Sequence, residues 1–467
     1  MSTRTARLTT LTTAVWLACT TGGLLTAAER IELREDAADS RIRKVEIELA
    51  VNGKLFPEPG PEKALKLEVE AAFDYTERRL AGTGRDAQAL RGIRHYDLAR
   101  ASIQAGGQTS NVLLRQSVRL LVAQGQLDGV DLFSPSGPLT YSEVELLRIP
   151  GDSLAIVGLL PDSAVEADES WKPAHWVVPL LTGVEAVEKH DLVCRLASVS
   201  SVEAVITFTG DVTGATVGAA SALHIEGRAV YDRKQNLVTR LELTQTEKRS
   251  IGAVSPGLDV AAKTVLTRSL VARPARLTDD DLAGLSLEAN EANRLLMFDA
   301  PAWNTRFYHD RRWHLFHQTS ESALLRLLDG GGLITQCNIK KLPDAEPGQH
   351  VSEEQFLADI ERTLGKNFGR IEQTEKLKLK DNLFVFRVIV SGTVERRNAK
   401  NEPEPGPMQW NYYLVAHADG RQIAFVFSLD PRQAEELENR DLAIVAGLEF
   451  LAARPRPEPA VKRTGGK

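Results

Sequence analysis

The segment HDRRWHLFH holds the densest group of side chains capable of chemistry. Three histidines, one aspartate and two arginines lie close together in it: His309, Asp310, Arg311, Arg312, His314 and His317. Imidazoles ligate metals and guanidinium groups bind carboxylates or phosphates, so a metal or anion site is one interpretation. On a strand, however, His314 and His317 point to opposite faces, and Asp310 fits a turn. We therefore predict no metal site here, and we place Trp313 in the core.

Two tryptophans and a histidine in DESWKPAHW form a second candidate. Trp171, His175 and Trp176 could line the mouth of a ligand site, because aromatic side chains offer large contact surfaces. Two tryptophans beside a proline also pack where a strand begins. We favour that structural role and assign no ligand to them.

Two further patterns have structural explanations. Asp279–Asp281 could hold a cation, but acidic residues also stabilise the first turn of a helix. Gly210, Gly214 and Gly218 recur at the spacing of a membrane helix dimer. Their segment is too short and polar for that, so we place these glycines in strand ends and turns.

The sequence patterns of the common enzyme classes are missing. The chain has no P-loop, no G-x-G-x-x-G after a predicted strand, no G-x-S-x-G and no H-E-x-x-H. We therefore assign no catalytic, cofactor-binding or metal-binding residues and expect no cofactor. The prediction is a protein that is not an enzyme.

Length and composition limit the remaining classes. The chain has 467 residues, which predicts two or three domains, and 43% of them are hydrophobic, which suffices for real cores. Its formal net charge of −6 argues against a nucleic-acid binder, which needs a basic field. Beyond the first 28 residues the only cysteines are Cys194 and Cys337, so we expect small buried thiols rather than a disulfide framework.

Residues 1–28 have the layout of a secretory signal peptide. Arg4 and Arg7 precede an acid-free apolar stretch, and small residues precede a cleavage position after Ala28. This predicts export to the periplasm or the extracellular space. A transit peptide and lipidation at Cys19 are alternatives, although Trp16 stands where a lipobox prefers leucine. No other segment approaches about 18 apolar residues, so we predict no transmembrane span in the mature chain.

The elements that position these residues fall into two halves. Residues 29–43 are dense in charge, and we expect a mobile segment there. From 44 to 275 apolar and polar residues alternate, for about a dozen residues in the run from Leu65 to Tyr75. One dry and one wet face are typical of an antiparallel sheet. We predict a β-rich domain, mainly antiparallel, as a curved sheet or half-barrel. Thr140 and Glu143 predict a capped short helix within it.

The second half follows a different pattern. We expect a linker helix within 276–299, capped by Thr278. Within 300–452, the segment WNYYLVAHADGRQIAFVFSLDP predicts a hairpin that is apolar on both faces, and such strands need cover on both sides. Amphipathic helices, one of them capped by Ser352 and burying Phe356, can supply that cover. The predicted fold class is α+β, with a C-terminal α/β/α sandwich around a mainly antiparallel sheet. Residues 453–467 are predicted to be a disordered tail.

Residues 300–452 resemble the PsbP-like α/β/α sandwich. The resemblance rests on FYHDRRWHL, on CNIKKLPDAEPGQHVSEEQFLADIERTL, and on YYLVAHADGRQIAFVFSLDP with the following AGLEF. PsbP-like domains are mainly binding or accessory modules, which implies association rather than chemistry. Residues from about 44 to 270 resemble the long curved sheets of LolA-like lipid carriers in strand length and alternation alone.

The sequence is compatible with three functions. The first is an exported, non-enzymatic binding or scaffold protein with a C-terminal interaction module and an unknown protein partner. The second is a carrier that holds a lipid or another apolar small molecule in the N-terminal curved sheet. The third is an uncharacterised exported hydrolase. A concave apolar surface inside the N-terminal sheet would favour the carrier, whereas a filled sheet face would favour the scaffold.

Overall fold

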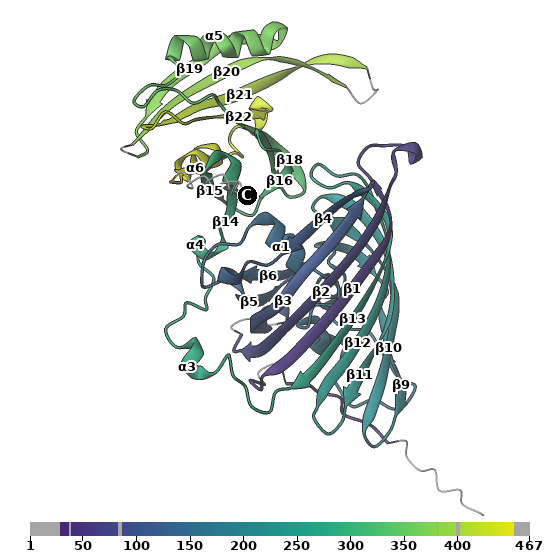
Figure 1. Cartoon of the computed structure of the whole chain (residues 1–467). Coiled ribbons are helices and arrows are strands. Elements are labelled where there is room, and N and C mark those ends of the chain that lie inside the picture. Colours follow the sequence, from purple (N-terminus) through teal and green to yellow (C-terminus); the bar gives the residue numbers. More distant parts are fainter. Residues whose placement is uncertain (1–28, 37–38, 83–85, 381, 398–401, 453–467) are drawn as a thin grey trace, which may run out of the picture.

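Antiparallel β-sheet dominates both halves of the chain (Figure 1). The computed structural model describes residues 29–36, 39–82, 86–380, 382–397 and 402–452. The predicted signal peptide and C-terminal tail lie outside these residues. The described chain forms an N-terminal module around a thirteen-stranded sheet, and a C-terminal module with a seven-stranded and a three-stranded sheet.

Thirteen strands wrap into a strongly curved, open sheet (Figure 1). They are β1 (Arg43–Phe56), β2 (Leu65–Leu80), β3 (Arg91–Ala105), β4 (Gln108–Leu113), β5 (Leu120–Gln126), β6 (Gly129–Phe133), β7 (Ser170–Trp171), β8 (Ala186–His190), β9 (Val193–Val199), β10 (Glu203–Thr216), β11 (Ala219–Asp232), β12 (Leu237–Arg249) and β13 (Gly257–Leu270). Their order is β6-β5-β3-β2-β1-β13-β12-β11-β10-β9-β7, with β4 beside β3 and β8 beside β10. All of these pairings are antiparallel, as the alternation predicted.

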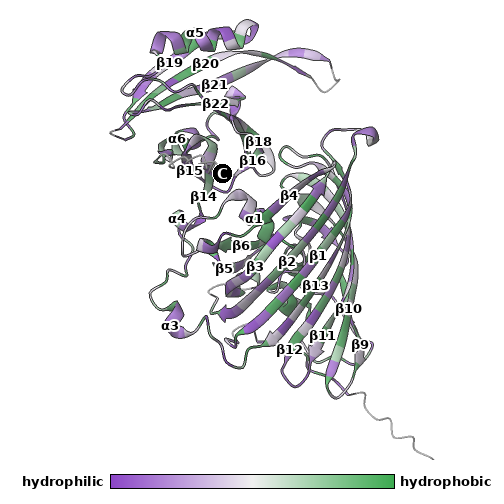
Figure 2. Ribbon diagram, viewed as in Figure 1, coloured by the Kyte–Doolittle hydropathy of each residue, from purple (hydrophilic) through white to green (hydrophobic). Residues whose placement is uncertain are grey.

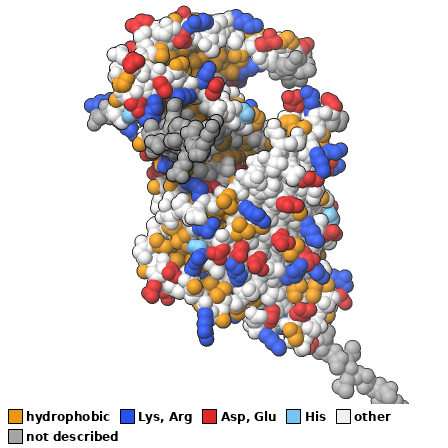
Figure 3. All heavy atoms as spheres, viewed as in Figure 1, with side chains coloured by type: hydrophobic (Ala, Val, Ile, Leu, Met, Phe, Trp, Pro, Cys, Tyr) orange, Lys and Arg blue, Asp and Glu red, His pale blue; other side chains and the backbone are white. Residues whose placement is uncertain are grey.

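Hydrophobic and hydrophilic residues alternate along the strands (Figure 2), and burial places the apolar ones on the inner face and the polar ones on the outer face. On β1, Val45 and Ile47 are buried inside, whereas Glu46 and Glu48 are exposed outside. Figure 3 shows charged side chains of both signs spread over the outer face. The sheet therefore presents one apolar face, which other parts of the chain or a ligand must cover.

Short helices fill much of the inner face. They are α1 (Tyr141–Leu147), α2 (Val177–Thr182) and the 3-10 helix η4 (Ala155–Leu159). The predicted capping box of α1 is confirmed, because Thr140 accepts a hydrogen bond from the Glu143 amide and Glu143 accepts one from the Thr140 amide. Three other 3-10 turns belong to this module: η1 (Pro61–Lys63), η2 (Asp86–Ala89) and η3 (Gln116–Val118).

The charged N-terminal segment 29–43 is packed where the sequence predicted mobility. Ile31 pairs with Val165 in an isolated β-bridge, and Ile31, Leu33 and Glu35 are buried at every second position. The charges that suggested mobility mostly lie on the exposed alternate positions. The two buried ones are Glu35, which is matched by Arg268, and Arg43, which pairs with Asp39. The described part of this segment therefore belongs to the N-terminal module.

The connection between the modules contains two short helices instead of the single expected one. These are α3 (Asp279–Leu282) and α4 (Glu291–Arg294). Thr278 caps α3 as predicted, with Asp281 completing a capping box. Gly284 ends the first helical stretch in a left-handed conformation (φ 78°), which glycine adopts readily.

The C-terminal module is built on a seven-stranded sheet with a small second sheet. The larger sheet has the order β16 (Trp313–Gln318), β17 (Ser322–Asp329), β18 (Gly332–Lys341), β22 (Gln422–Leu429), β21 (Pro403–His417), β20 (Leu383–Arg397) and β19 (Phe368–Leu377). The smaller one has the order β14 (Leu296–Ala300), β15 (Thr305–His309) and β23 (Glu449–Phe450). The hairpin predicted around the Asp-Gly turn is confirmed as β21 and β22.

Each face of the seven-stranded sheet has its own apolar cluster. Phe356 and Ile360 of α5 (Glu353–Leu364) pack with Tyr412 on one face. Phe427 on the other face packs with Val445 of α6 (Arg440–Ala446) and with the small sheet. The remaining 3-10 turns are η5 (Pro301–Trp303), η6 (Gly365–Asn367) and η7 (Pro431–Gln433). Trp313 lies in the core as predicted, with 1% exposure.

Limited proteolysis of the full chain should cut first between residues 272 and 300. This connection is exposed along most of its length, and protease cleavage concentrates in such segments. We expect two protected fragments, visible by mass spectrometry, and two calorimetric transitions. A single inseparable transition without protected fragments would contradict the division into two modules.

Candidate functional site

The structure disperses the histidines of HDRRWHLFH. His309 is buried and its Nδ1 lies 2.8 Å from the Asp310 carbonyl oxygen, His317 is exposed, and His314 packs edge-on against Tyr141 of the N-terminal module. Within the described ranges, no group of three or more histidine, cysteine or acidic side chains is placed to hold a metal ion. The segment serves packing between the modules.

The other sequence candidates also occupy structural positions. The Trp171 indole donates to the Leu159 carbonyl at 3.1 Å, and both Trp171 and Trp176 pack against the core. Cys194 and Cys337 are buried, unpaired thiols in separate modules. Burial raises the pKa of Cys194 to about 12, which makes this thiol a poor nucleophile at neutral pH.

The inner face of the curved sheet has three levels along its strands, and the lowest is charged. One cross-strand row there consists of Arg43, Glu77 and Arg94. Arg94 donates to Glu77 at 2.9 Å and binds both oxygens of Asp152 at 2.6 and 2.9 Å. Burial by itself raises the pKa of Glu77, but Arg79, Arg94 and the hydroxyl of Ser153 lower it to about 2. This buried network ties the loop after α1 to the sheet, and its side chains are closed to solvent.

The middle level is filled. Val45, Ile47, Phe73 and Leu266 pack in one apolar cluster with residues of α1, η4 and α2. Glu143 of α1 anchors this filling through Arg115, whose Nε lies 2.7 Å from Oε1. A ligand has no place at this level.

The upper level is apolar and remains outside the packed core. Three consecutive rows continue the inner face above the helices, in register across β13, β1 and β2, and two of them extend to β3. Nine of their apolar side chains form what we name the upper inner face: Val51, Leu55, Leu65, Leu67, Val69, Ile103, Leu258, Val260 and Ala262. Among the described residues, none of the nine belongs to an apolar core cluster or packs against one.

Six of these nine side chains are more exposed than the core residues, and the other three are buried. Leu67, Val260 and Ala262 are 7–8% exposed, Leu65 is 37% exposed, and the other five lie between these values. A cross-strand apolar surface of this kind on the concave side of a sheet can bury a further apolar group without disturbing the core.

A charged border adjoins the upper inner face. On β12, Glu247 and Arg249 lie directly beside Val260 and Leu258 in the same rows, and they pair with one another at 2.7 Å. Glu145 of α1 lies near Arg249 and 3.7 Å from Arg148. The apolar rows therefore end against a cluster of charged side chains that we name the polar border: Glu145, Arg148, Glu185, Glu247 and Arg249.

The C-terminal module rests on the same end of the curved sheet (Figure 1). On one side the Tyr141 hydroxyl lies 3.4 Å from Nδ1 of His314, and Arg311 pairs with Asp131 at 2.9 Å. On another side the Arg326 guanidinium donates to the Ala253 carbonyl in the turn between β12 and β13. The upper turn between β12 and β13 and the β5–β6 edge of the sheet therefore both contact the second module.

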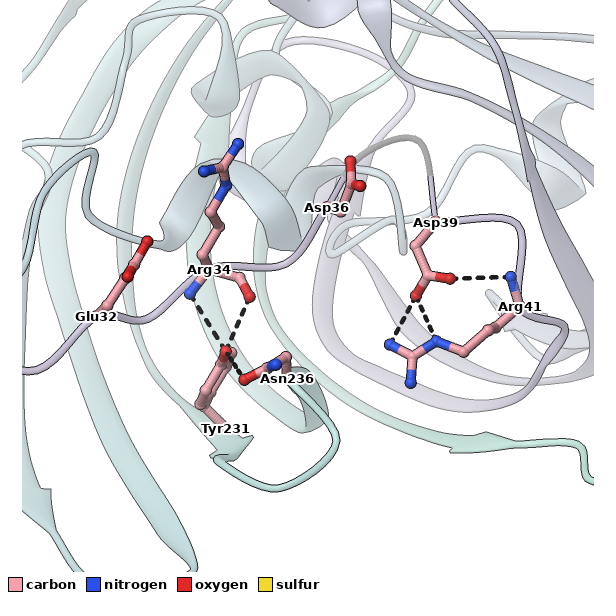
Figure 4. Close-up of a pocket in the computed structure, with 7 residues that line it drawn as sticks. All are labelled: Glu32, Arg34, Asp36, Asp39, Arg41, Tyr231 and Asn236. Carbon is pink, nitrogen blue, oxygen red and sulfur yellow. Dashed lines mark hydrogen bonds and ion pairs between the residues drawn. The ribbon is translucent and has the colours of Figure 1, made fainter.

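Two pockets lie elsewhere. One of about 490 Å³ lies beside the N-terminal segment and is lined by polar side chains (Figure 4). There the Tyr231 hydroxyl donates to the Arg34 carbonyl at 2.8 Å and accepts from the Arg34 amide at 3.2 Å. These bonds fasten the segment to β11. The other, of about 630 Å³, lies in the C-terminal module, where Arg396 and Arg432 both pair with Asp430.

Part of this site could be predicted from the sequence. The alternation from Leu65 onward indicated a dry face and raised the carrier hypothesis. The polar border was missed, because Glu145 and Arg148 look like ordinary residues of a surface helix. A sequence signal would have been residues that are buried around most of the helix, which marks an enclosed helix rather than a surface one. With only seven residues, α1 is too short to show such a pattern.

In the part of the chain that the structure describes, no helix combines the length and apolar character needed to cross a bilayer.

Comparisons with known proteins show only distant structural similarity. No family model and no curated protein matches the chain. A lipovitellin structure determined for its lipid–protein interactions shares 10% identity at a TM-score of 0.31, covering 52% of this chain and 26% of that one. An AttH protein of Nitrosomonas europaea shares 8% identity at a TM-score of 0.15, covering 87% and 98%. OccK11 (OpdR) of Pseudomonas aeruginosa shares 7% identity at a TM-score of 0.12, covering 86% and 98%. The chain thus spans about a quarter of the lipovitellin chain. None of these three is a PsbP-like or LolA-like protein, and similarity at this level assigns no function.

Proposed function

We propose that this protein is an exported, non-enzymatic binding protein that holds a single-chain amphiphile against the upper inner face. One observation carries the proposal: nine apolar side chains form continuous rows on the concave face, yet they lie outside every core cluster of the described residues. At roughly 25 cal/mol per Å², covering such rows with an acyl chain is favourable. Export is proposed from the leader in residues 1–28.

The C-terminal module has a supporting role in this proposal. We interpret it as an α/β/α sandwich that restricts access to the upper inner face and offers a surface for a protein partner. Its contacts at Tyr141 and Ala253 flank the apolar rows, which supports the first part. The scaffold hypothesis, which the sequence placed first, explains the filled middle level but gives no reason for the apolar rows above it.

The test uses N-phenyl-1-naphthylamine, a neutral dye whose fluorescence increases in apolar surroundings. We expect saturable binding to the full mature chain. Val51→Asp should weaken it at least about tenfold, because an unpaired carboxylate against the dye costs more than the 1.4 kcal/mol that a tenfold change requires. The matched control is Ala50→Asp, one residue away on the exposed outer face.

A second variant separates binding from folding. Ala262→Trp should reduce dye binding by occupying the apolar surface without adding a charge, while the thermal midpoint shows that the module still folds. Absence of saturable dye binding to the wild type, or equal loss in the Ala50→Asp control, would refute the proposal.

A further inference from the structure

The polar border carries more negative than positive charge. It has three glutamates and two arginines, Glu145, Glu185, Glu247, Arg148 and Arg249, and both arginines have a nearer partner than Glu145. Arg249 lies 2.7 Å from Glu247, and Arg148 lies 3.4 Å from Glu185 but 3.7 Å from Glu145. Glu185 is further satisfied by the Val217 amide at 2.8 Å. Glu145 is therefore the least compensated carboxylate of the cluster.

Glu145 is accessible although protein surrounds it. Its side chain is 48% exposed, compared with 8% for Glu247 and 35% for Glu185. Burial nevertheless raises the pKa of Glu145, an effect that Arg148 opposes and Glu185 reinforces. At 48% exposure the carboxylate can be reached by a ligand charge, and its partly buried surroundings screen that charge less than an open surface would.

Arg249 connects the Glu145 carboxylate to the apolar rows. Leu258 of the upper inner face lies beside Arg249 in the β12–β13 register, and Arg249 is one of the charged groups that act on Glu145. Tyr141 and, from the C-terminal module, His314 and Arg311 also lie near Arg148. Tyr141 carries no positive charge, burial beside Arg148 lowers the pKa of His314 to about 4, and the charge of Arg311 is matched by Asp131 at 2.9 Å.

We propose that the amphiphile bound by this protein has a cationic head group, and that Glu145 is its counter-charge. The proposal rests on the proposed function, since the apolar chain would occupy the upper inner face. The positive head would lie at the border beyond Leu258, where it completes the charge balance of the three glutamates and two arginines. An anionic head at the same place would meet Glu145, the least compensated carboxylate of the cluster, and would be disfavoured.

The experiment compares three head groups on one chain. Decyltrimethylammonium, 1-decanol and decanoate displace N-phenyl-1-naphthylamine from the full mature chain at pH 7.5 and low salt, all below their micellar concentrations. We expect decyltrimethylammonium to bind about tenfold more tightly than decanoate, corresponding to about 1.4 kcal/mol. Glu145→Gln should reduce this preference to about threefold or less, and Glu145→Lys should reverse it. The control Glu226→Gln removes an exposed carboxylate from the outer face of β11 and should leave the preference unchanged.

The outcomes separate the two proposals. Equal displacement by the three compounds, or a preference for decanoate, refutes the cationic head while leaving apolar binding intact. A cation preference that persists in Glu145→Gln refutes the role of Glu145, because the remaining glutamates would then be sufficient. Failure of the dye to bind at all refutes the proposed function itself.

Discussion

Glu35→Gln should lower the free energy of unfolding of the N-terminal module by about 3–5 kcal/mol. Glu35 is 4% exposed and accepts hydrogen bonds from both terminal nitrogens of Arg268, at 2.9 and 2.6 Å. The amide retains the shape but leaves the buried guanidinium without a counter-charge. Arg43 and Arg79 also attract the Glu35 carboxylate electrostatically, so without its charge the repulsion among these arginines would be less compensated. Denaturant unfolding followed by circular dichroism measures the loss.

The control for this substitution is Glu48→Gln, which changes the same chemistry on the exposed outer face of β1. It should alter stability by no more than about 0.5 kcal/mol. A similarly small effect of Glu35→Gln would mean that segment 29–36 contributes little to the fold. Acid provides an independent check. Burial favours a raised pKa for Glu35, but Arg268 lowers it overall, so its stabilisation is present at neutral pH and disappears as the pH falls below the ordinary carboxyl range. In Glu35→Gln, the loss of stability at acidic pH that comes from protonating Glu35 should be absent.

Phe356→Ala should destabilise the C-terminal module by about 3–5 kcal/mol, through lost burial and the cavity that remains. Phe356 is 6% exposed and packs edge-to-face with Phe386 and Tyr412, at ring-centre distances of 6.3 and 6.4 Å. These contacts attach α5 to the sheet. The signal is tryptophan fluorescence, to which Trp410 of the same cluster contributes. The measurement is denaturant unfolding of the full chain.

Two controls accompany this variant. Phe316→Ala removes the same side chain from a half-exposed site, at 46% exposure, and should cost about 1 kcal/mol or less. A chelator should leave the midpoint of the wild type unchanged, because the histidines near Phe316 are dispersed rather than gathered around a metal. A chelator-sensitive midpoint would contradict this assignment, and equal effects of the two phenylalanine variants would contradict the role of α5.

Local sequence patterns determined the parts of the fold that depend on neighbouring residues. Period-two alternation identified the strands and their dry face, since a pleated strand turns successive side chains to opposite sides. The Asp-Gly turn located the β21–β22 hairpin, and the Thr140 and Thr278 caps marked the starts of two helices. The expected long linker helix was wrong, because Gly284 interrupts it and neither short helix has a buried face to stabilise it.

Only the tertiary structure decided how the dry face of the N-terminal sheet is used. Alternation predicts that Ile47 and Val51 share a face, yet one is enclosed by the core cluster and the other lies beyond it. The difference arises because α1, η4 and α2 fill one level of the strands and stop before the next, and how far they reach depends on contacts between distant residues. The pairing of charged residues that are distant in sequence also depends on the tertiary structure. Glu35 with Arg268, and Glu145 with Arg249, are neighbours that only folding brings together, and the energy of such pairs depends on burial that no local pattern encodes.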